Sequence, residues 1–187
     1  MDLDQERELI KKAQKAPDAF ARLYDEYYPK IFGYVLRRTA NLEAAQDITS
    51  ETFLKALGKL WQFQWRNVSF SSWLYKIATN ESRQYFRKAE YKKSVSLEEL
   101  QEQGFELLSP HDPEDELIEA QEKLKQHQEF LEIQEKIVQL PAKYQEVIAL
   151  RFFEKKQIKE IAQILGKREG TIKSLLHRAV EKLRETD

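Results

Sequence analysis

The chain has 187 residues, of which 34% are charged and 41% are hydrophobic, and its formal net charge is -1 at pH 7. It contains no cysteine, which excludes a disulfide framework and a thiolate metal site, and its three histidines are scattered, which disfavours a zinc site. No apolar run approaches the roughly 20 residues needed to cross a bilayer. We therefore expect a cytoplasmic protein without a metal or another cofactor.

The charge is unevenly distributed along the chain. Residues 1–93 hold 17 Lys/Arg against 12 Asp/Glu, residues 94–140 hold 3 against 13, and residues 141–187 hold 11 against 7. Basic ends are typical of proteins that bind nucleic acids, but the acidic middle cancels much of their long-range attraction. We therefore do not expect tight binding to DNA by this chain alone.

Apolar residues at helical spacing predict helices from the N-terminus onward. A short helix that contains Leu9 and Ala13 is expected to end near Pro17. A longer apolar stripe then continues to about Arg38, with a kink expected at Pro29.

Two further helices are expected in the same part of the chain. Asn41 is suited to cap a helix over residues 42–60, because its side chain can accept a hydrogen bond from a free backbone N–H of the first turn. Ser71 or Ser72 is expected to cap the next helix, which runs to about Glu90.

The composition changes sharply after this helical part. Residues 94–129 are acidic, and their first half is rich in Ser, Gln, Gly and Pro, which predicts a solvated linker. Helical residues return from Glu114 to Leu140 with only a thin apolar stripe, and Pro141 is expected to begin a helix. With few β-branched runs in the chain, these patterns predict an all-α fold of two small helical domains, residues 1–93 and 130–187, joined by an acidic linker.

The last two predicted helices have the size and the junction of a helix-turn-helix. Residues 157–165 and 171–184 each carry an apolar stripe, and Gly166 between them can adopt the left-handed conformation that ends a helix. In DNA-binding proteins the second helix of such a pair enters the major groove. Its outward side is mostly polar and partly cationic, which suits phosphates and guanine edges: Gly170, Lys173, Ser174, His177, Arg178 and Glu181. The alternative is a solvated face on an ordinary helix pair.

A second candidate surface lies on the predicted helix that follows residue 70. Away from its packing side, cationic, amide and aromatic residues form a strip: Trp73, Lys76, Asn80, Arg83, Gln84, Arg87 and Tyr91. The preceding loop adds Phe63, Trp65, Arg66, Asn67 and Phe70. This mixture suits single-stranded DNA, because bases stack on aromatic rings while cations meet phosphates, and a loop on a rigid scaffold can hold a flipped base. The alternative is that the aromatic rings, Phe70 and Trp73 first, cover a small core.

The predicted helix over residues 42–60 offers a different surface. One side carries Asp47, Ser50, Glu51 and Leu54, and the other carries Ala45, Ile48, Thr52 and Ala56. Two acids beside an exposed leucine can dock a protein. A plain solvated face is the alternative.

Two sets of motifs resemble the extracytoplasmic-function group of bacterial sigma factors, the smallest members of the sigma-70 family. The first set is FARLYDEYY at residues 20–28, DITSETF at residues 47–53 and FSSWLYKIATN at residues 70–80. The second set is LPAKYQEVIALR at residues 140–151, IKEIAQIL at residues 158–165 and GTIKSLLHRAVEKLR at residues 170–184. The order and the spacing of both sets match the family.

The resemblance implies a non-catalytic subunit that gives RNA polymerase its promoter specificity and helps to melt the promoter. Residues 1–93 would be sigma region 2, which binds the clamp of core polymerase and the minus-10 element, and residues 130–187 would be region 4, which binds the polymerase flap and the minus-35 element. The implied partners are core RNA polymerase, duplex and single-stranded promoter DNA and, in many family members, an anti-sigma factor. No direct insertion into a membrane is implied.

The same resemblance implies a role for each candidate surface. The polymerase contacts would be Asp47, Ser50, Glu51 and Leu54. The minus-10 contacts would be Phe63, Trp65, Arg66, Asn67, Phe70, Trp73, Lys76, Asn80, Arg83, Gln84 and Arg87. The minus-35 contacts would be Lys167, Arg168, Lys173, Ser174, His177 and Arg178.

The chain departs from the family pattern at a few positions. Ser50 stands where Gln is usual, Leu175 stands where a basic residue is frequent, and the loop between Phe63 and Phe70 lacks the common glycine. These departures leave the recognised promoter sequence open. A free-standing regulator that binds duplex DNA without polymerase is the alternative function, and an enzyme acting on nucleic acid is disfavoured because no acidic or histidine cluster marks a catalytic centre.

Overall fold

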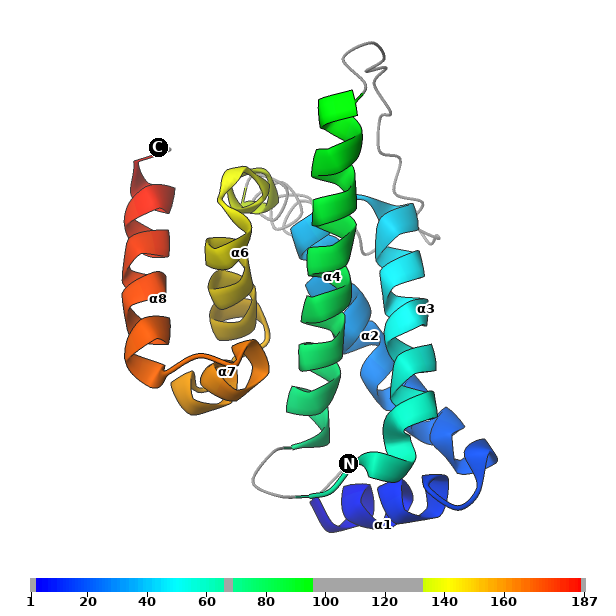
Figure 1. Ribbon diagram of the computed structural model, residues 1–187. Helices are drawn as coiled ribbons and strands as arrows, with labels where there is room; N and C mark the ends of the chain where they lie inside the picture. The colour runs from blue at the N-terminus through cyan, green and yellow to red at the C-terminus, as the bar shows by residue number, and fades with distance from the viewer. Residues whose placement is uncertain (1–2, 66–68, 96–132, 186–187) are drawn as a thin grey trace, which may run out of the picture.

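The computed structural model describes residues 3–65, 69–95 and 133–185, and every regular element in these ranges is a helix (Figure 1). The expected all-α fold is confirmed. The helices are α1 (Leu3–Ala13), α2 (Phe20–Thr39), α3 (Leu42–Lys59), α4 (Phe70–Val95), α6 (Ala142–Ile148), α7 (Ile158–Leu165) and α8 (Glu169–Arg184). Short 3₁₀ turns occupy Pro17–Ala19 and Leu60–Gln62, a π-helical turn occupies Ala149–Phe153, and residues 133–139 are also helical. In these ranges no helix combines the length and the apolar character that a membrane span requires.

Helix α2 continues without interruption past the proline at which a kink was expected. Its buried stripe includes Leu23, Tyr27, Ile31 and Tyr34. Pro29 lies on the exposed side of the helix, so the backbone carbonyl that loses its N–H partner there can be hydrated.

The helix starts show one confirmed cap and one correction. Asn41 Oδ1 accepts a hydrogen bond from the N–H of Ala44 at 2.7 Å, as expected at the start of α3. The expected cap of α4 by Ser71 or Ser72 is wrong, because the Ser69 hydroxyl accepts the N–H of Ser72 at 3.1 Å. Helix α4 therefore begins at Phe70, and it extends to Val95 rather than ending near residue 90.

The turn between α7 and α8 forms as expected. Gly166 adopts φ 64° and ψ 38°, a left-handed conformation that costs other residues more than glycine, and it ends α7. Helix α8 begins at Glu169, two residues earlier than expected.

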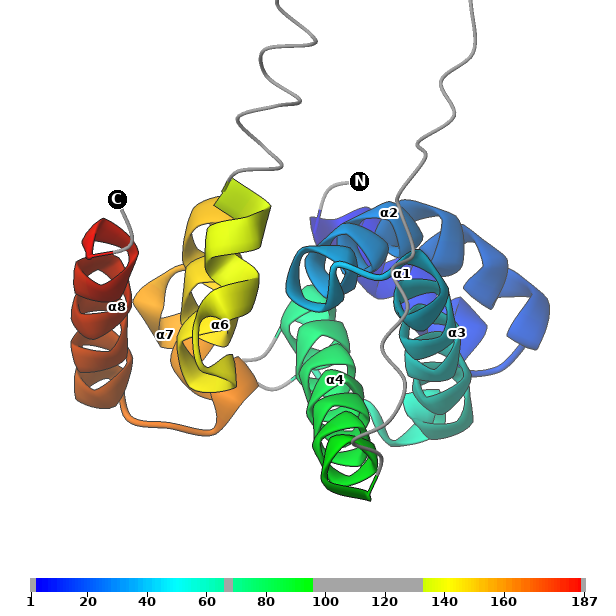
Figure 2. The same ribbon diagram turned by 90° about the horizontal axis from the view of Figure 1, so that it is seen from above.

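The N-terminal bundle (α1 to α4) and the C-terminal bundle (residues 133–185) pack against each other, as Figures 1 and 2 show from two directions. Helix α4 contacts α7, and α2 contacts the π-helical turn. Buried apolar residues from both bundles form one core cluster, from Ile10 to Ala179. Residues 96–129 of the predicted linker lie outside the described residues.

Candidate nucleic-acid interface

Helix α4 presents the predicted strip on its exposed side. Lys76, Asn80, Gln84 and Arg87 are all exposed, and they follow one another at intervals of three or four residues. Because residues at this spacing share one face of a helix, they form a continuous polar line. With Arg83, which is also exposed, the exposed part of the strip combines three cations with two amides, groups that can contact phosphates and the edges of unpaired bases.

The aromatic residues of the strip and its loop divide into two classes. Phe70 is fully buried and Phe63 nearly so, and their ring centroids lie 5.5 Å apart. Trp65 and Trp73 are half-buried, and both pack edge-on or tilted against Phe63. In this structure Phe63 and Phe70 belong to the core, while the two tryptophans keep surface that a base could contact. Arg66 and Asn67 lie outside the described residues.

Helix α1 holds the beginning of this loop. Gln14 Nε2 donates hydrogen bonds to two loop carbonyls, Leu60 at 3.0 Å and Phe63 at 2.8 Å. The guanidinium of Arg7 lies 5.2 Å from the centre of the Trp65 ring, within the range of a cation–π contact. Sequence reasoning missed this role of α1, because no local pattern reports a contact between residues nearly 50 positions apart.

The turn and the outward face of α8 carry the second set of candidate residues. Those in the turn are Lys167 and Arg168, and those on the helix are Lys173, Ser174, His177 and Arg178; all six are exposed. Nδ1 of His177 lies 3.2 Å from the carboxylate of Glu181, one helical turn away. Leu175 is partly buried against the core cluster, so it contributes to packing.

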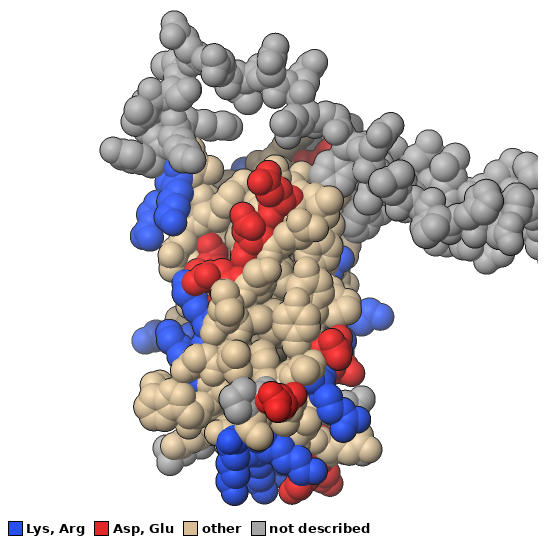
Figure 3. All heavy atoms as spheres, turned by 90° about the vertical axis from the view of Figure 1, so that its right-hand side faces the viewer, with Lys and Arg blue, Asp and Glu red and all other residues tan. Residues whose placement is uncertain are grey.

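The exposed face of α3 matches the predicted division of that helix. Asp47, Ser50, Glu51 and Leu54 are exposed, and the opposite set is buried: Ala45, Ile48, Thr52 and Ala56. The exposed fraction is 64% for Leu54 and 71% for Trp61, which lies seven residues later in the 3₁₀ turn that follows α3. Figure 3 shows this side of the molecule, where acidic groups lie within a largely uncharged surface. The sequence pattern did not indicate that Trp61 lies beside this face, because it follows the end of the predicted apolar stripe.

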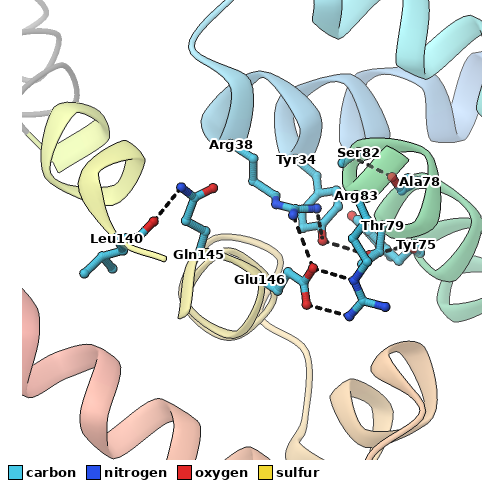
Figure 4. A network of polar contacts seen from close by, with 10 residues as sticks. All are labelled: Tyr34, Arg38, Tyr75, Ala78, Thr79, Ser82, Arg83, Leu140, Gln145 and Glu146. Atoms are coloured by element: carbon cyan, nitrogen blue, oxygen red, sulfur yellow. Dashed lines mark hydrogen bonds and ion pairs between the residues drawn. The ribbon is translucent and has the colours of Figure 1, made fainter. Parts of the chain in front are cut away.

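One predicted DNA contact, Arg83, is paired within the protein. Its Nε and Nη2 donate to the two carboxylate oxygens of Glu146 on α6, each at 2.7 Å (Figure 4). The same carboxylate accepts a 3.3 Å hydrogen bond from Nη2 of Arg38, a fully buried side chain on α2. Hydrogen bonding to Glu146 raises the pKa of Arg83 above its ordinary value, so the guanidinium stays protonated.

A second polar cluster joins the two bundles nearby. Glu154, in the C-terminal bundle, accepts hydrogen bonds from the Arg37 guanidinium and from the Tyr75 hydroxyl. Burial, followed by the charge of Glu154, raises the pKa of Tyr75 far above its ordinary value, so the phenol remains a donor. Lys156 Nζ donates to the Ser71 hydroxyl at 2.7 Å. The two bundles are therefore joined by hydrogen bonds and ion pairs as well as by apolar packing.

Comparison with protein families gives two matches that together cover most of the described chain. The family described as Sigma-70 region 2 matches residues 23–91, and the family described as Sigma-70, region 4 matches residues 130–183. Helix α1, with Gln14, precedes the first match.

Comparison with individual proteins gives relatives of about one third identity. The chain is 34% identical over 182 residues to the ECF RNA polymerase sigma factor SigW of Bacillus subtilis, covering 94% of this chain and 93% of that protein. It is 33% identical over 177 residues to the ECF RNA polymerase sigma factor BldN of Streptomyces coelicolor, where the match covers 94% of this chain but 63% of the relative.

Solved structures with a similar fold include two complexes. CnrH in complex with the cytosolic domain of CnrY gives a TM-score of 0.68 at 19% identity, covering 97% of this chain and 96% of that one. The sigma factor RpoE in complex with the anti-sigma factor NepR from Bartonella quintana gives 0.65 at 22% identity, covering 89% and 94%.

Proposed function

The chain belongs to the sigma-70 family, in the extracytoplasmic-function group, and we propose that its two exposed basic surfaces bind the minus-10 and minus-35 elements of a promoter. As a sigma factor it confers promoter recognition and promoter melting on RNA polymerase. The observation that carries the proposal is that one chain presents a strip suited to single-stranded DNA on α4 and a strip suited to duplex DNA on α8.

The α4 strip binds the melted minus-10 element. Its exposed contacts are Lys76, Asn80, Arg83, Gln84 and Arg87, with the accessible parts of Trp65 and Trp73 available for stacking. Phe63 and Phe70 act from the core by supporting the two tryptophans. Arg66 and Asn67 remain predicted contacts from their place in the loop. Stacking and phosphate contacts of this kind stabilise an exposed strand without any catalytic group.

Helix α8 binds the minus-35 element as duplex DNA. Lys173, Ser174, His177 and Arg178 face the major groove, while Lys167 and Arg168 lie at the turn, where they can meet phosphates. The hydrogen-bond donors on this face can read base edges, and Leu175 adds no cation to it.

The exposed face of α3 binds the polymerase clamp. Asp47, Ser50, Glu51 and Leu54 present a mixed acidic and apolar surface, and Trp61 extends it. A large aromatic beside an exposed leucine is the kind of group that dominates protein interfaces. A serine at position 50 provides a shorter polar contact than the glutamine that is usual in the family.

The partners of the proposed function are core RNA polymerase, promoter DNA and an anti-sigma factor. RpoE, one of the proteins with a similar fold, was solved with its anti-sigma factor NepR. The protein acts in the cytoplasm, where the polymerase works, and has no catalytic activity of its own.

The deciding experiment combines the purified chain, core polymerase and a supercoiled promoter library. Specific transcripts that require both proteins are the expected result. Tight and specific binding to duplex DNA by the chain alone, without such transcripts, would instead identify a free-standing regulator.

A further inference from the structure

The carboxylate of Glu146 occupies a site built from two arginines of the N-terminal bundle. It is 2% exposed, and three N–H groups, two from Arg83 and one from Arg38, surround it. Figure 4 shows the side chain reaching from α6 toward α2 and α4. Arg83 comes from the helix that carries the predicted strand-binding strip, so an internal carboxylate holds one of its cations.

The geometry of this pair is also the geometry of phosphate recognition. The parallel Nε and Nη2 donors of an arginine bind a carboxylate or a phosphate in the same two-pronged manner. The DNA backbone offers such an anion once per nucleotide. Glu146 therefore stands where a backbone phosphate could be held by the same donors.

Glu146 does not satisfy the whole site. Nε of Arg38 is buried and has no hydrogen-bond partner within the described part of the chain, although the guanidinium lies against the rings of Tyr34 and Phe86. A buried donor without a partner is costly. A DNA phosphate presents its two unesterified oxygens in a tetrahedral arrangement rather than in the plane of a carboxylate, so a phosphate at this place could accept from Nε of Arg38.

The ion pairs allow the contact between the bundles to be replaced by a contact with another anion. A buried ion pair adds little stability compared with apolar packing, but removing one partner leaves an uncompensated charge. Moving α6 away therefore requires another anion for Arg38 and Arg83. DNA can supply one, so the bundles can separate on DNA more readily than in its absence.

We propose that Arg38 and Arg83 form a phosphate-binding site for the single strand of the opened promoter, and that Glu146 occupies this site while the two bundles are packed together. This inference rests on the proposed role of the α4 strip, and it adds Arg38 to that role. In the packed form Glu146 occupies the Nε and Nη2 donors of Arg83, and Arg38 is fully buried. Glu154, bound to Arg37 and Tyr75, holds α6 and α7 in the blocking position.

The test measures binding of a fluorescently labelled oligothymidylate to the full chain by anisotropy, over a series of salt concentrations. Glu146→Gln is expected to bind about tenfold tighter than the wild type, the factor that corresponds to one charge-assisted hydrogen bond. Its salt dependence is expected to steepen by about 0.7 for each phosphate newly contacted. Glu185→Gln, which removes one charge from an exposed position of the same bundle, is the matched control and is expected to leave affinity nearly unchanged.

The double variant Arg38→Gln/Glu146→Gln distinguishes phosphate binding by Arg38 from a general effect of separating the bundles. It removes both partners of one contact, so it leaves no unpaired carboxylate, and it is expected to lose most of the tenfold gain. A double variant that binds as tightly as Glu146→Gln would overturn the role of Arg38.

A second measurement uses the absence of cysteine to label the chain at two chosen positions. Spin labels at Lys59→Cys on α3 and Arg184→Cys on α8, both exposed positions outside the proposed DNA contacts, report the distance between the bundles. Adding oligothymidylate to the labelled protein with Glu146 intact is expected to lengthen this distance. An unchanged distance, together with unchanged affinity in Glu146→Gln, would overturn the proposal.

A longer distance in Glu146→Gln without tighter DNA binding would overturn the phosphate site. Neither measurement contains polymerase, so a failure of the proposed promoter function would be seen separately, as the absence of polymerase-dependent transcripts from the wild type.

Discussion

Individual side chains on α4 and α8 differ in how directly their substitution tests a contact with DNA. Arg83 has two anions available to it, the carboxylate of Glu146 and a phosphate of the promoter, while Asn80 is exposed and is an amide that can bind a base edge. Arg178 on α8 is likewise exposed. The two exposed residues are therefore the clearest probes of the proposed DNA contacts.

Replacing Asn80 with alanine is expected to impair promoter opening more than docking on duplex DNA. The reason is that its amide lies on the strip proposed to bind the melted strand. Permanganate reactivity of thymines in the opened region measures melting, and footprinting of the minus-35 element measures docking. Unchanged permanganate reactivity would remove Asn80 from the melting role.

Replacing Arg178 with alanine is expected to weaken minus-35 binding by about 1 to 3 kcal/mol if it contacts a base edge. The measurement is competition between the mapped minus-35 element and altered elements in the polymerase complex. A specific contact gives a loss that is largest on the correct sequence. Equal losses on all sequences would reassign Arg178 to a phosphate.

At the scale of elements, α1 has a clear structural task although it lies before the region 2 match. Gln14 fastens the loop that leads to the tryptophans, and Arg7 lies over Trp65. A loop that must hold a base needs a defined starting conformation, and these two contacts supply one.

Gln14→Ala is expected to lower the free energy of unfolding by about 1 to 3 kcal/mol, because it leaves two loop carbonyls without their shared donor. Urea unfolding measures the loss, and quenching of tryptophan fluorescence by iodide tests whether Trp65 becomes more accessible. Lys12→Ala, at an exposed position of the same helix, is the control for a general effect on α1. If both variants unfold alike, the two hydrogen bonds of Gln14 do not hold the loop.

At the scale of the whole molecule, polar contacts determine how the two bundles meet. Helix α4 faces the proposed minus-10 strand and also packs against the C-terminal bundle. A surface with both tasks cannot perform them fully at the same time, so promoter binding and bundle packing compete. The carboxylate of Glu146 acts as the internal competitor of DNA, and Glu154 holds the packed arrangement through Arg37 and Tyr75.

Stability is expected to fall with rising pH above about 10, the ordinary pKa of tyrosine. The pKa of Tyr75 is raised in the folded protein, so its contribution is complete below pH 10 and decreases as the unfolded chain releases the proton. Each such tyrosine costs about 1.4 kcal/mol for each further pH unit. Tyr34, which is also buried with a raised pKa, contributes in the same direction.

Urea unfolding over this pH range measures how the free energy of unfolding changes with pH. Tyr75→Phe is expected to make this slope shallower by the contribution of one titrating group. An identical slope in Tyr75→Phe would show that the Tyr75 phenol is not held neutral between the bundles.

The candidate surfaces were predictable where exposure follows from helical periodicity. The outward sides of α3, α4 and α8 agree with the spacing of their apolar residues, which is local information. The aromatic loop was not predictable in the same way, because Phe70 and Trp73 stand close together in the sequence yet only Phe70 is fully buried. The cap of α4 is Ser69 rather than Ser71 or Ser72, since three serines within four residues offer equivalent local chemistry.

The sequence by itself determined the helices, the left-handed turn at Gly166 and the family, because these depend on spacing, on backbone conformation and on motifs within short segments. Only the tertiary structure decided that Arg38 and Arg83 meet Glu146 and that Gln14 holds the aromatic loop. These contacts join residues far apart in the chain, and the charge pattern contains many arginines and glutamates that could have formed other pairs. Packing of the two bundles selects among them.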